Sequence, residues 1–242
     1  MERTNIRNMH NLHGRKIILI CLGFFMSLNT FAQNQNWIHW DTERKIHFGF
    51  LLGTNFATFK YYTSNAFRKQ DSIKGVNMIK YPGISLGAVA DLHLGRRFDF
   101  RFTPTLTITD RRVNYTFADT FSIQKDVESA LIEFPLLFAI HSDRPGNVRF
   151  YAVGGFKFSY DLASNAFNSR NPADPNVAVL PINLYYEFGA GLDLFYPYFK
   201  FSPEIKLARG INDIFAPHND SYNNVFSSLR SNIIYFTFYF EG

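Results

Sequence analysis

The feature of this sequence that most restricts its fold is a two-residue alternation of apolar and polar side chains. In FDFRFTPTLTIT, residues 98–109, phenylalanine, leucine and isoleucine share one parity with Pro104, whereas aspartate, arginine and threonine fill the other. Successive side chains of a strand point to opposite faces, so the stretch predicts a strand with one apolar face. Eight segments follow this pattern, at about 46–57, 83–94, 98–109, 130–141, 149–161, 183–194, 198–208 and 231–240.

The lengths of these segments and of their connections favour a membrane barrel. Each segment has about the 9–11 residues that a tilted strand needs to cross a bilayer. Three connections are short, at 95–97, 142–148 and 195–197, and four are long, at about 58–82, 110–129, 162–182 and 209–230. The predicted fold is all-β, an eight-stranded antiparallel up-and-down transmembrane β-barrel of the bacterial outer membrane. Its long connections should be extracellular and its short turns periplasmic.

The apolar faces are expected to point outward, toward outer-membrane lipid. A soluble barrel alternates in the same way but turns its apolar side chains inward. Here the apolar faces are rich in phenylalanine, and such large rings would overfill the lumen of an eight-stranded barrel, which is just wide enough for side chains. The faces are those of Ala130, Ile132, Phe134, Leu136, Phe138 and Ile140, of Leu184, Tyr186, Phe188, Ala190, Leu192 and Leu194, and of Ile234, Phe236, Phe238 and Phe240.

The opposite parity predicts a charged barrel interior. Buried charges are costly unless they are paired and hydrogen-bonded, so we expect a salt-bridge network that fills the lumen as a plug. Pro104, Pro135 and Pro203 lie within predicted strands, and because proline has no N–H to donate, each should mark a bulge or a local break. The predicted network members are Asp91, Asp99, Arg101, Glu133, Lys157, Asp161, Glu187, Asp193, Lys200, Glu204 and Lys206.

Residues 1–32 have the features of a cleaved signal peptide, with a basic start, a short apolar core and a small-x-small site before Gln33. Residues 33–45 are expected to form a periplasmic leader, in which Trp37 and Trp40 either anchor at the membrane interface or contact the barrel rim. Residues 46–242 form the predicted barrel. Cys21, the single cysteine, lies in the signal, so the predicted mature chain has no disulfide.

The sequence has no pattern typical of a catalytic, cofactor or metal site. Ser85, Asp91 and His93 share a parity but lie in line on one predicted strand, so His93 cannot lie between the other two as a hydrolase triad requires. We therefore expect no enzyme. The remaining histidines are scattered, without the helical pair or cysteine partners of a zinc site, and we expect no metal. They are His39, His47, His93, His141 and His218.

The charge distribution does not favour nucleic acid as a partner. Once the signal is removed, basic and acidic side chains are nearly balanced, and no basic run is interleaved with aromatic residues. The first two long connections are nevertheless basic, which suits contact with lipopolysaccharide phosphates or an acidic partner, or simple solvation. Their basic residues are Arg68, Lys69, Lys74, Lys80, Arg111 and Arg112.

Three stretches resemble a known family. IEFPLLFAIHSDR at 132–144, YAVGGFKFSYDLAS at 151–164 and FSPEIKLARGINDIF at 201–215 are similar to the PorT family of outer-membrane barrels, within a broader superfamily of small barrels. That family belongs to the type IX secretion and gliding machinery. The resemblance implies a non-enzymatic component needed to export proteins with a C-terminal sorting signal. Its partners would be other secretion components, reached through long extracellular loops or periplasmic turns.

Two alternatives to the secretion role remain open at this point. Because the broader superfamily shares part of the motif, the chain is also compatible with an OmpX-like barrel for adhesion or membrane integrity. An outer-membrane enzyme that modifies lipid is the third possibility.

Overall fold

The computed structural model describes residues 45–64, 73–117, 122–144, 146–164, 179–216 and 225–242. The proposed signal peptide, Trp37 and Trp40 of the leader, and Arg68 and Lys69 lie outside these residues. The described part of the chain contains no helix that is long and apolar enough to cross a membrane. The strands are β1 (Ile46–Thr63), β2 (Ile73–His93), β3 (Phe98–Phe102), β4 (Thr105–Phe117), β5 (Ser122–His141), β6 (Val148–Asp161), β7 (Ile182–Phe195), β8 (Lys200–Gly210) and β9 (Phe226–Glu241).

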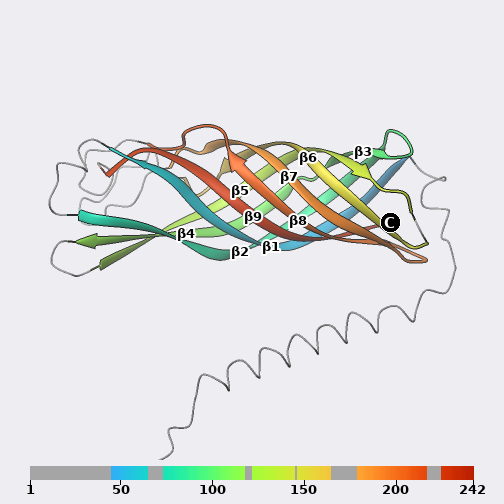
Figure 1. Ribbon diagram of the computed structural model, residues 1–242, viewed down its shortest axis with the longest axis horizontal. Helices are drawn as coiled ribbons and strands as arrows, with labels where there is room; N and C mark the ends of the chain where they lie inside the picture. Colours follow the sequence, from blue (N-terminus) through green and yellow to red (C-terminus); the bar gives the residue numbers. More distant parts are fainter. Residues whose placement is uncertain (1–44, 65–72, 118–121, 145, 165–178, 217–224) are drawn as a thin grey trace, which may run out of the picture. The chain divides into compact units, whose positions relative to one another are not determined.

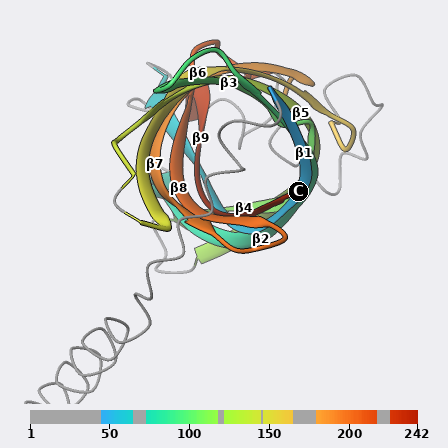
Figure 2. The same ribbon diagram turned by 90° about the vertical axis from the view of Figure 1, so that its right-hand side faces the viewer.

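The strands form a closed antiparallel ring, as Figures 1 and 2 show. Strands that follow one another in the sequence pair with each other, except β3 and β4, and β1 pairs with both β2 and β9, which closes the ring. β3 and β4 are two parts of one barrel strand, because both pair with β2 on one side and β5 on the other. The predicted eight-stranded up-and-down barrel is therefore confirmed.

The division between β3 and β4 lies at one of the three predicted prolines. Thr103 and Pro104 leave the ladder, but the register is the same on both sides, with Phe102 opposite Leu136 and Thr105 opposite Glu133. Pro135 lies across this gap, and its carbonyl accepts a hydrogen bond from the Thr103 N–H at 3.3 Å. One local break, without a bulge, thus accommodates two residues that lack an N–H.

The third predicted proline, Pro203, lies in β8 beside a second gap. The β7–β8 pairing omits residues 192–193 and 202–203 and resumes in the same register. A bulge is found instead near Pro82, where the β2–β4 register shifts between Lys80 and Ile84. Pro82 was assigned to a connection by the sequence pattern but lies within β2.

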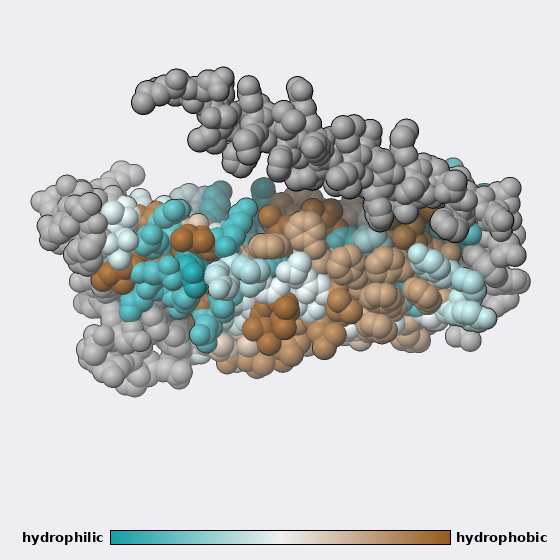
Figure 3. Space-filling model, turned by 90° about the horizontal axis from the view of Figure 1, so that it is seen from below, coloured by the Kyte–Doolittle hydropathy of each residue, from teal (hydrophilic) through white to brown (hydrophobic). Residues whose placement is uncertain are grey.

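The outward faces of the strands form an apolar belt. Phe48, Phe150 and Phe156 are 64%, 60% and 68% exposed, and the predicted outward residues of β5, β7 and β9 are exposed or half-buried. Figure 3 shows this belt on one face of the barrel, with hydrophilic side chains gathered toward one end. The predicted orientation, with apolar side chains outside and charged side chains inside, agrees with this pattern of exposure.

The first two predicted long connections are wrong in extent, because most of each is strand. β1 continues to Thr63, β2 begins at Ile73, β4 continues to Phe117 and β5 begins at Ser122. The sequence pattern missed these strands because their outward faces lack the large apolar side chains that mark the lipid-spanning segments. Their outward side chains are polar, for example Arg112 and Asp126. We call residues 73–80, 111–117 and 122–129, which pair with one another, the β2–β4–β5 extension.

The end of the barrel that carries the extension is filled by an apolar cluster, which we call the apolar cap. Residues 179–180 and 214–215 fold into this end, where Val179 pairs with Phe215 and the Ile214 N–H donates to the Leu229 carbonyl at 2.9 Å. The buried members of the cap are Phe59, Val113, Tyr115, Val127, Val179, Ile214, Val225, Phe226 and Leu229. The opposite end carries the short turns.

Candidate functional site

Below the apolar cap, the barrel interior is occupied by charged and hydroxyl-bearing side chains. All eleven residues predicted for the interior network are buried, with exposures of 0–6%. Since inward positions alternate with lipid-facing ones along each strand, neighbouring strands contribute these side chains to a common lumen. Ten of the eleven take part in ion pairs. These form three connected groups along the barrel.

The central group surrounds Arg101 of β3, which is completely buried. Its guanidinium donates to Asp91 through Nη2 at 3.0 Å and Nε at 3.2 Å, and to Glu204 through Nη1 at 3.2 Å. The guanidinium also lies 5.0 Å from the ring centre of Tyr151 and 4.9 Å from that of Tyr239. Both tyrosine hydroxyls donate to Glu204, at 2.9 and 3.0 Å. The cation is thus held by charge and by two aromatic faces.

The second group lies between the central group and the apolar cap. Lys157 Nζ contacts Glu133 at 2.8 Å and Glu187 at 3.0 Å, and it donates to the Tyr235 hydroxyl at 2.8 Å. Lys206 bridges Glu187, at 3.2 Å, and Glu204 of the central group, at 3.7 Å. A cavity lined by Glu133, Glu187 and Lys206 holds about 10 Å³, which leaves room for little more than one water molecule.

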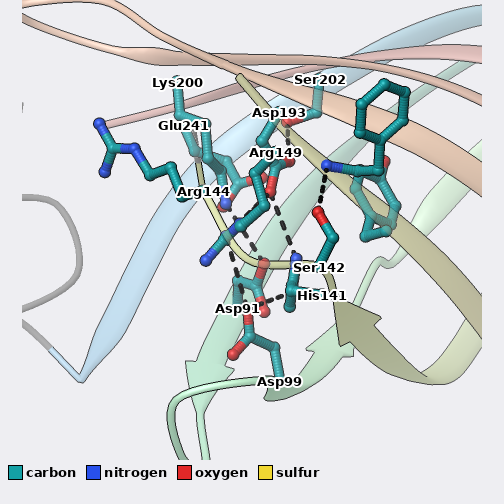
Figure 4. A network of polar contacts seen from close by, with 12 residues as sticks. Asp91, Asp99, His141, Ser142, Arg144, Arg149, Asp193, Lys200, Ser202 and Glu241 are labelled. Carbon is teal, nitrogen blue, oxygen red and sulfur yellow. Dashed lines mark hydrogen bonds and ion pairs between the residues drawn. The ribbon is translucent and has the colours of Figure 1, made fainter. Parts of the chain in front are cut away.

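The third group lies at the short-turn end, and Figure 4 shows most of it. Asp99 contacts His93 Nδ1 at 2.7 Å and His141 Nε2 at 2.6 Å. His141 Nδ1 faces Asp193 at 3.4 Å. Asp193 also accepts hydrogen bonds from Arg149 Nε at 2.9 Å and from the Ser202 hydroxyl at 2.7 Å. The result is a continuous chain of contacts that runs from His93 to Asp99, His141, Asp193 and Arg149.

One predicted network member stands apart from these groups. Asp161 is buried, but its Oδ1 accepts hydrogen bonds from the backbone N–H groups of Ala130, at 3.2 Å, and Ala163, at 3.0 Å. It therefore fixes the connection after β6 to the start of the β5–β6 ladder. Among the described residues, it forms no ion pair with the interior cations.

The structure adds three charged residues that the sequence analysis did not include. Arg149 is the first residue of one predicted segment and Glu241 directly follows another. Both are on the inward parity, so the alternation itself could have identified them. Glu241 contacts Lys200 at 2.9 Å. Arg111 was predicted to lie in the second long connection, and this is wrong: it is 2% exposed in β4 and donates to the hydroxyls of Ser129 and Ser231.

Three further residues of the basic connections are on the β2–β4–β5 extension. Lys80 is exposed, and Arg112 forms a two-point hydrogen bond with Asp126, at 2.8 and 3.0 Å, while lying over the Tyr81 ring. Lys74 lies in β2, but its side chain is not described. The first two connections are therefore not uniformly basic surfaces, because one arginine is buried and another is paired.

The residues considered for a hydrolase triad are engaged elsewhere. The Ser85 hydroxyl accepts a hydrogen bond from Asn55 Nδ2 and shares another with the Thr107 hydroxyl, both at 3.1 Å. Asp91 binds Arg101, and His93 contacts Asp99. Ser85 and His93 are thus in different groups of the interior.

The histidines, in contrast, are less scattered than their sequence positions indicate. β1–β2 pairing places His47 opposite Asp91, and its ring centre is 4.9 Å from that of His93. His141, at the end of β5, reaches the same Asp99 as His93 does. The sequence could not reveal this grouping, because it depends on the register between strands that are far apart in the chain.

Comparison with known proteins agrees with this architecture. Residues 31–216 match the family model described as outer membrane protein beta-barrel domain. Among solved structures, the outer membrane protein OprG of Pseudomonas aeruginosa aligns with 82% of this chain and 97% of its own, at 12% identity and a TM-score of 0.45. The N-terminal β-barrel domain of OprF from the same organism aligns with 78% and 96%, at 12% identity and a TM-score of 0.33. No curated protein sequence matches the chain.

Proposed function

The chain belongs to the outer membrane protein beta-barrel domain family, and from this premise we propose that it is a non-enzymatic component of the type IX secretion machinery. In this role it is needed for the export of proteins that carry a C-terminal sorting signal. The proposal rests on the resemblance to the PorT family. Two of the resembling stretches lie on β5 and β6, which are paired with each other, and the third lies on β8 and the connection after it.

The observation that most favours an accessory role is the filled barrel. The apolar cap fills one end, and the ion-pair groups fill the rest of the described lumen. A folded or an extended cargo chain cannot pass through an interior whose cavity holds about 10 Å³. The barrel therefore acts through its surfaces, by binding other components of the secretion machinery, and not as the channel.

The β2–β4–β5 extension is the surface that we assign to this binding. The described β1–β2 ladder ends at Ala57 opposite Tyr81, and the β5–β6 ladder ends at Leu131 opposite Asp161. Beyond these points, β2 and β5 each pair only with β4 among the described strands. Each therefore has one edge that no other described strand pairs with, which is a template for adding a strand from a partner.

The proposal is tested by deletion and by partial complementation. Deletion of the gene should block secretion, so that cargo with the C-terminal signal accumulates in the periplasm. A variant in which a short turn replaces residues 113–125 keeps every strand pair below the extension. It should reach the outer membrane but fail to restore secretion. Normal secretion in the deletion strain would overturn the proposed role. Full complementation by the shortened variant would overturn only the assignment of the binding surface.

The same extension also supports a second candidate, an adhesion or membrane-integrity barrel. An exposed sheet edge can add a strand from a host or a neighbouring protein as readily as one from a secretion component. A deletion strain with normal secretion but with lost surface attachment, or with new sensitivity to detergent, would favour this function. Cargo location in the deletion strain thus separates the two candidates in one experiment.

A further inference from the structure

The short-turn end brings together donor atoms that suit a metal ion. Asp91 and His93 lie two residues apart on β2, and so face the same side of the strand, while Asp99 on β3 is directly opposite His93 in the ladder. One ligand atom from each of these three side chains lies within 4.8 Å of the others. From this geometry we infer that the barrel binds one divalent transition-metal ion at Asp91, His93 and Asp99.

The donor set defines the class of ion. One imidazole nitrogen with two carboxylates suits Zn²⁺, and also Mn²⁺ or Fe²⁺, better than it suits Ca²⁺, which prefers six to eight oxygen ligands. Asp91 uses Oδ2 to hold Arg101 and, at 3.5 Å, Lys200. Its Oδ1 is buried and has no hydrogen-bond partner, so this atom is available for a metal.

The surrounding residues form the second shell that a bound metal requires. Metal-ligating carboxylates are usually oriented by a further hydrogen bond. Here His141 contacts the Oδ2 atom of Asp99, the one that His93 does not use. His141 is in turn fixed by Asp193, which Arg149 and Ser202 hold in place. Asp99 is thus held in a defined position before any ion binds.

The charge of the interior also favours a cation at this end. Among the described residues, eight aspartates and glutamates are buried against six lysines and arginines. A surplus of two negative charges inside a barrel is costly unless it is neutralised. One divalent ion would offset this difference between the carboxylates and the lysine and arginine side chains. The cations nearest to the three ligands are Arg101, Lys200 and Arg149, and each of them already contacts two or more carboxylates.

The position of the ligands gives the ion a route from solution. His93 is the last residue of β2, and its side chain is 14% exposed, whereas Asp91 is fully buried. The turn that follows, residues 94–97, is exposed. In an outer-membrane barrel the short turns face the periplasm. The site therefore loads from the periplasmic side, with His93 as the first ligand that the ion meets.

Titration of the purified barrel with zinc tests this inference. The protein is refolded in detergent with a tag that contains no histidine, treated with a chelator and titrated with Zn²⁺ by calorimetry. We expect one Zn²⁺ per barrel and a higher melting temperature with zinc, because an ion that binds only the folded state stabilises it. A wild-type barrel that binds no Zn²⁺, or that binds Ca²⁺ equally well, would overturn the inference.

Three variants locate the ion. His93→Ala removes a ligand and should abolish the one-to-one binding. His141→Ala removes only the residue that orients Asp99 and should weaken binding about 10–100-fold. Asp143→Asn is the matched control, because Asp143 is an exposed carboxylate at the same end, paired with Arg97, and should leave zinc affinity unchanged. The gel mobility of unheated samples verifies folding. Unchanged affinity in folded His93→Ala would place the zinc elsewhere and contradict the site.

Discussion

Replacing Arg101 by alanine tests whether the central ion-pair group holds the barrel together. Arg101 is fully buried and contacts three carboxylates: Asp91, Glu204 and, at 4.0 Å, Glu241. Removing one partner of a buried ion pair costs about 3–5 kcal/mol, because the remaining charge is left uncompensated. The Arg101 substitution also increases the surplus of buried negative charge and removes two aromatic contacts. We therefore expect Arg101→Ala to lower the free energy of unfolding by about 4–5 kcal/mol, near the upper end of that range.

The neighbouring residue gives a matched control for this substitution. Phe102 follows Arg101 on β3 but points outward and is half-buried. Phe102→Ala should cost about 2 kcal/mol, which is the transfer term for a large apolar side chain, because lipid fills the space and no cavity remains. The double variant Arg101→Ala/Asp91→Asn should recover part of the loss, since one of the unpaired carboxylates is then neutral.

The measurement is urea unfolding of the barrel in lipid vesicles, followed by the gel mobility of unheated samples. Free energies of unfolding are compared for wild type, the two single variants and the double variant. If Phe102→Ala destabilised the barrel more than Arg101→Ala does, the assignment of inward and outward faces would be wrong. If the double variant showed no recovery, the charge of Asp91 would not be the source of the loss.

Three further predictions concern the wall, the lumen and the orientation of the barrel. Gly155→Ala should prevent folding, because a Cβ there would collide with the Leu136 carbonyl, whereas Gly154→Ala should fold, since its nearest neighbour is the Glu187 carbonyl at 3.8 Å; refolding yield decides between these outcomes. Purified barrel in a planar bilayer should show no steady stepwise conductance, and a stable open channel would contradict the filled lumen. Cysteine introduced at Gln124 should react with an impermeant thiol reagent on intact cells, and cysteine at Arg96 only after the outer membrane is opened; the reverse pattern would invert the barrel.

The sequence predicted the lipid-spanning part of the fold well because two physical requirements act on it at once. A strand in a bilayer must alternate, and its outward side chains must be apolar, so Phe134, Leu136 and Phe138 define both a strand and its orientation. The second requirement, apolar outward side chains, does not apply to the β2–β4–β5 extension. On β4 and β5, inward Val113 and Val127 still alternate, but outward Arg112 and Asp126 are polar because this part has no lipid to face.

The arrangement of the interior was only partly predictable for a different reason. Parity shows that Asp91, Asp99 and His141 point into the lumen, but it gives no information on which of them meet. That depends on the stagger of strands around a closed ring, which places the end of β5 beside the β2–β3 turn. The resulting grouping of His93 and His141 around Asp99 has no local signal in the sequence.

The ion pairs of the interior have a consequence for the register of the strands. Replacing a buried ion pair by apolar residues of similar volume is often neutral or stabilising, so net stability alone is a weak reason for so many charges. A slip of one residue in any strand, however, would turn its charges toward lipid and its phenylalanines into the lumen. In β6, such a slip would expose Lys157 to the bilayer and force Phe156 and Phe158 into a filled interior. A lysine at the bilayer midplane costs about 2–4 kcal/mol, and overpacking adds to that cost. The charged interior therefore excludes misregistered barrels more effectively than it stabilises the correct one.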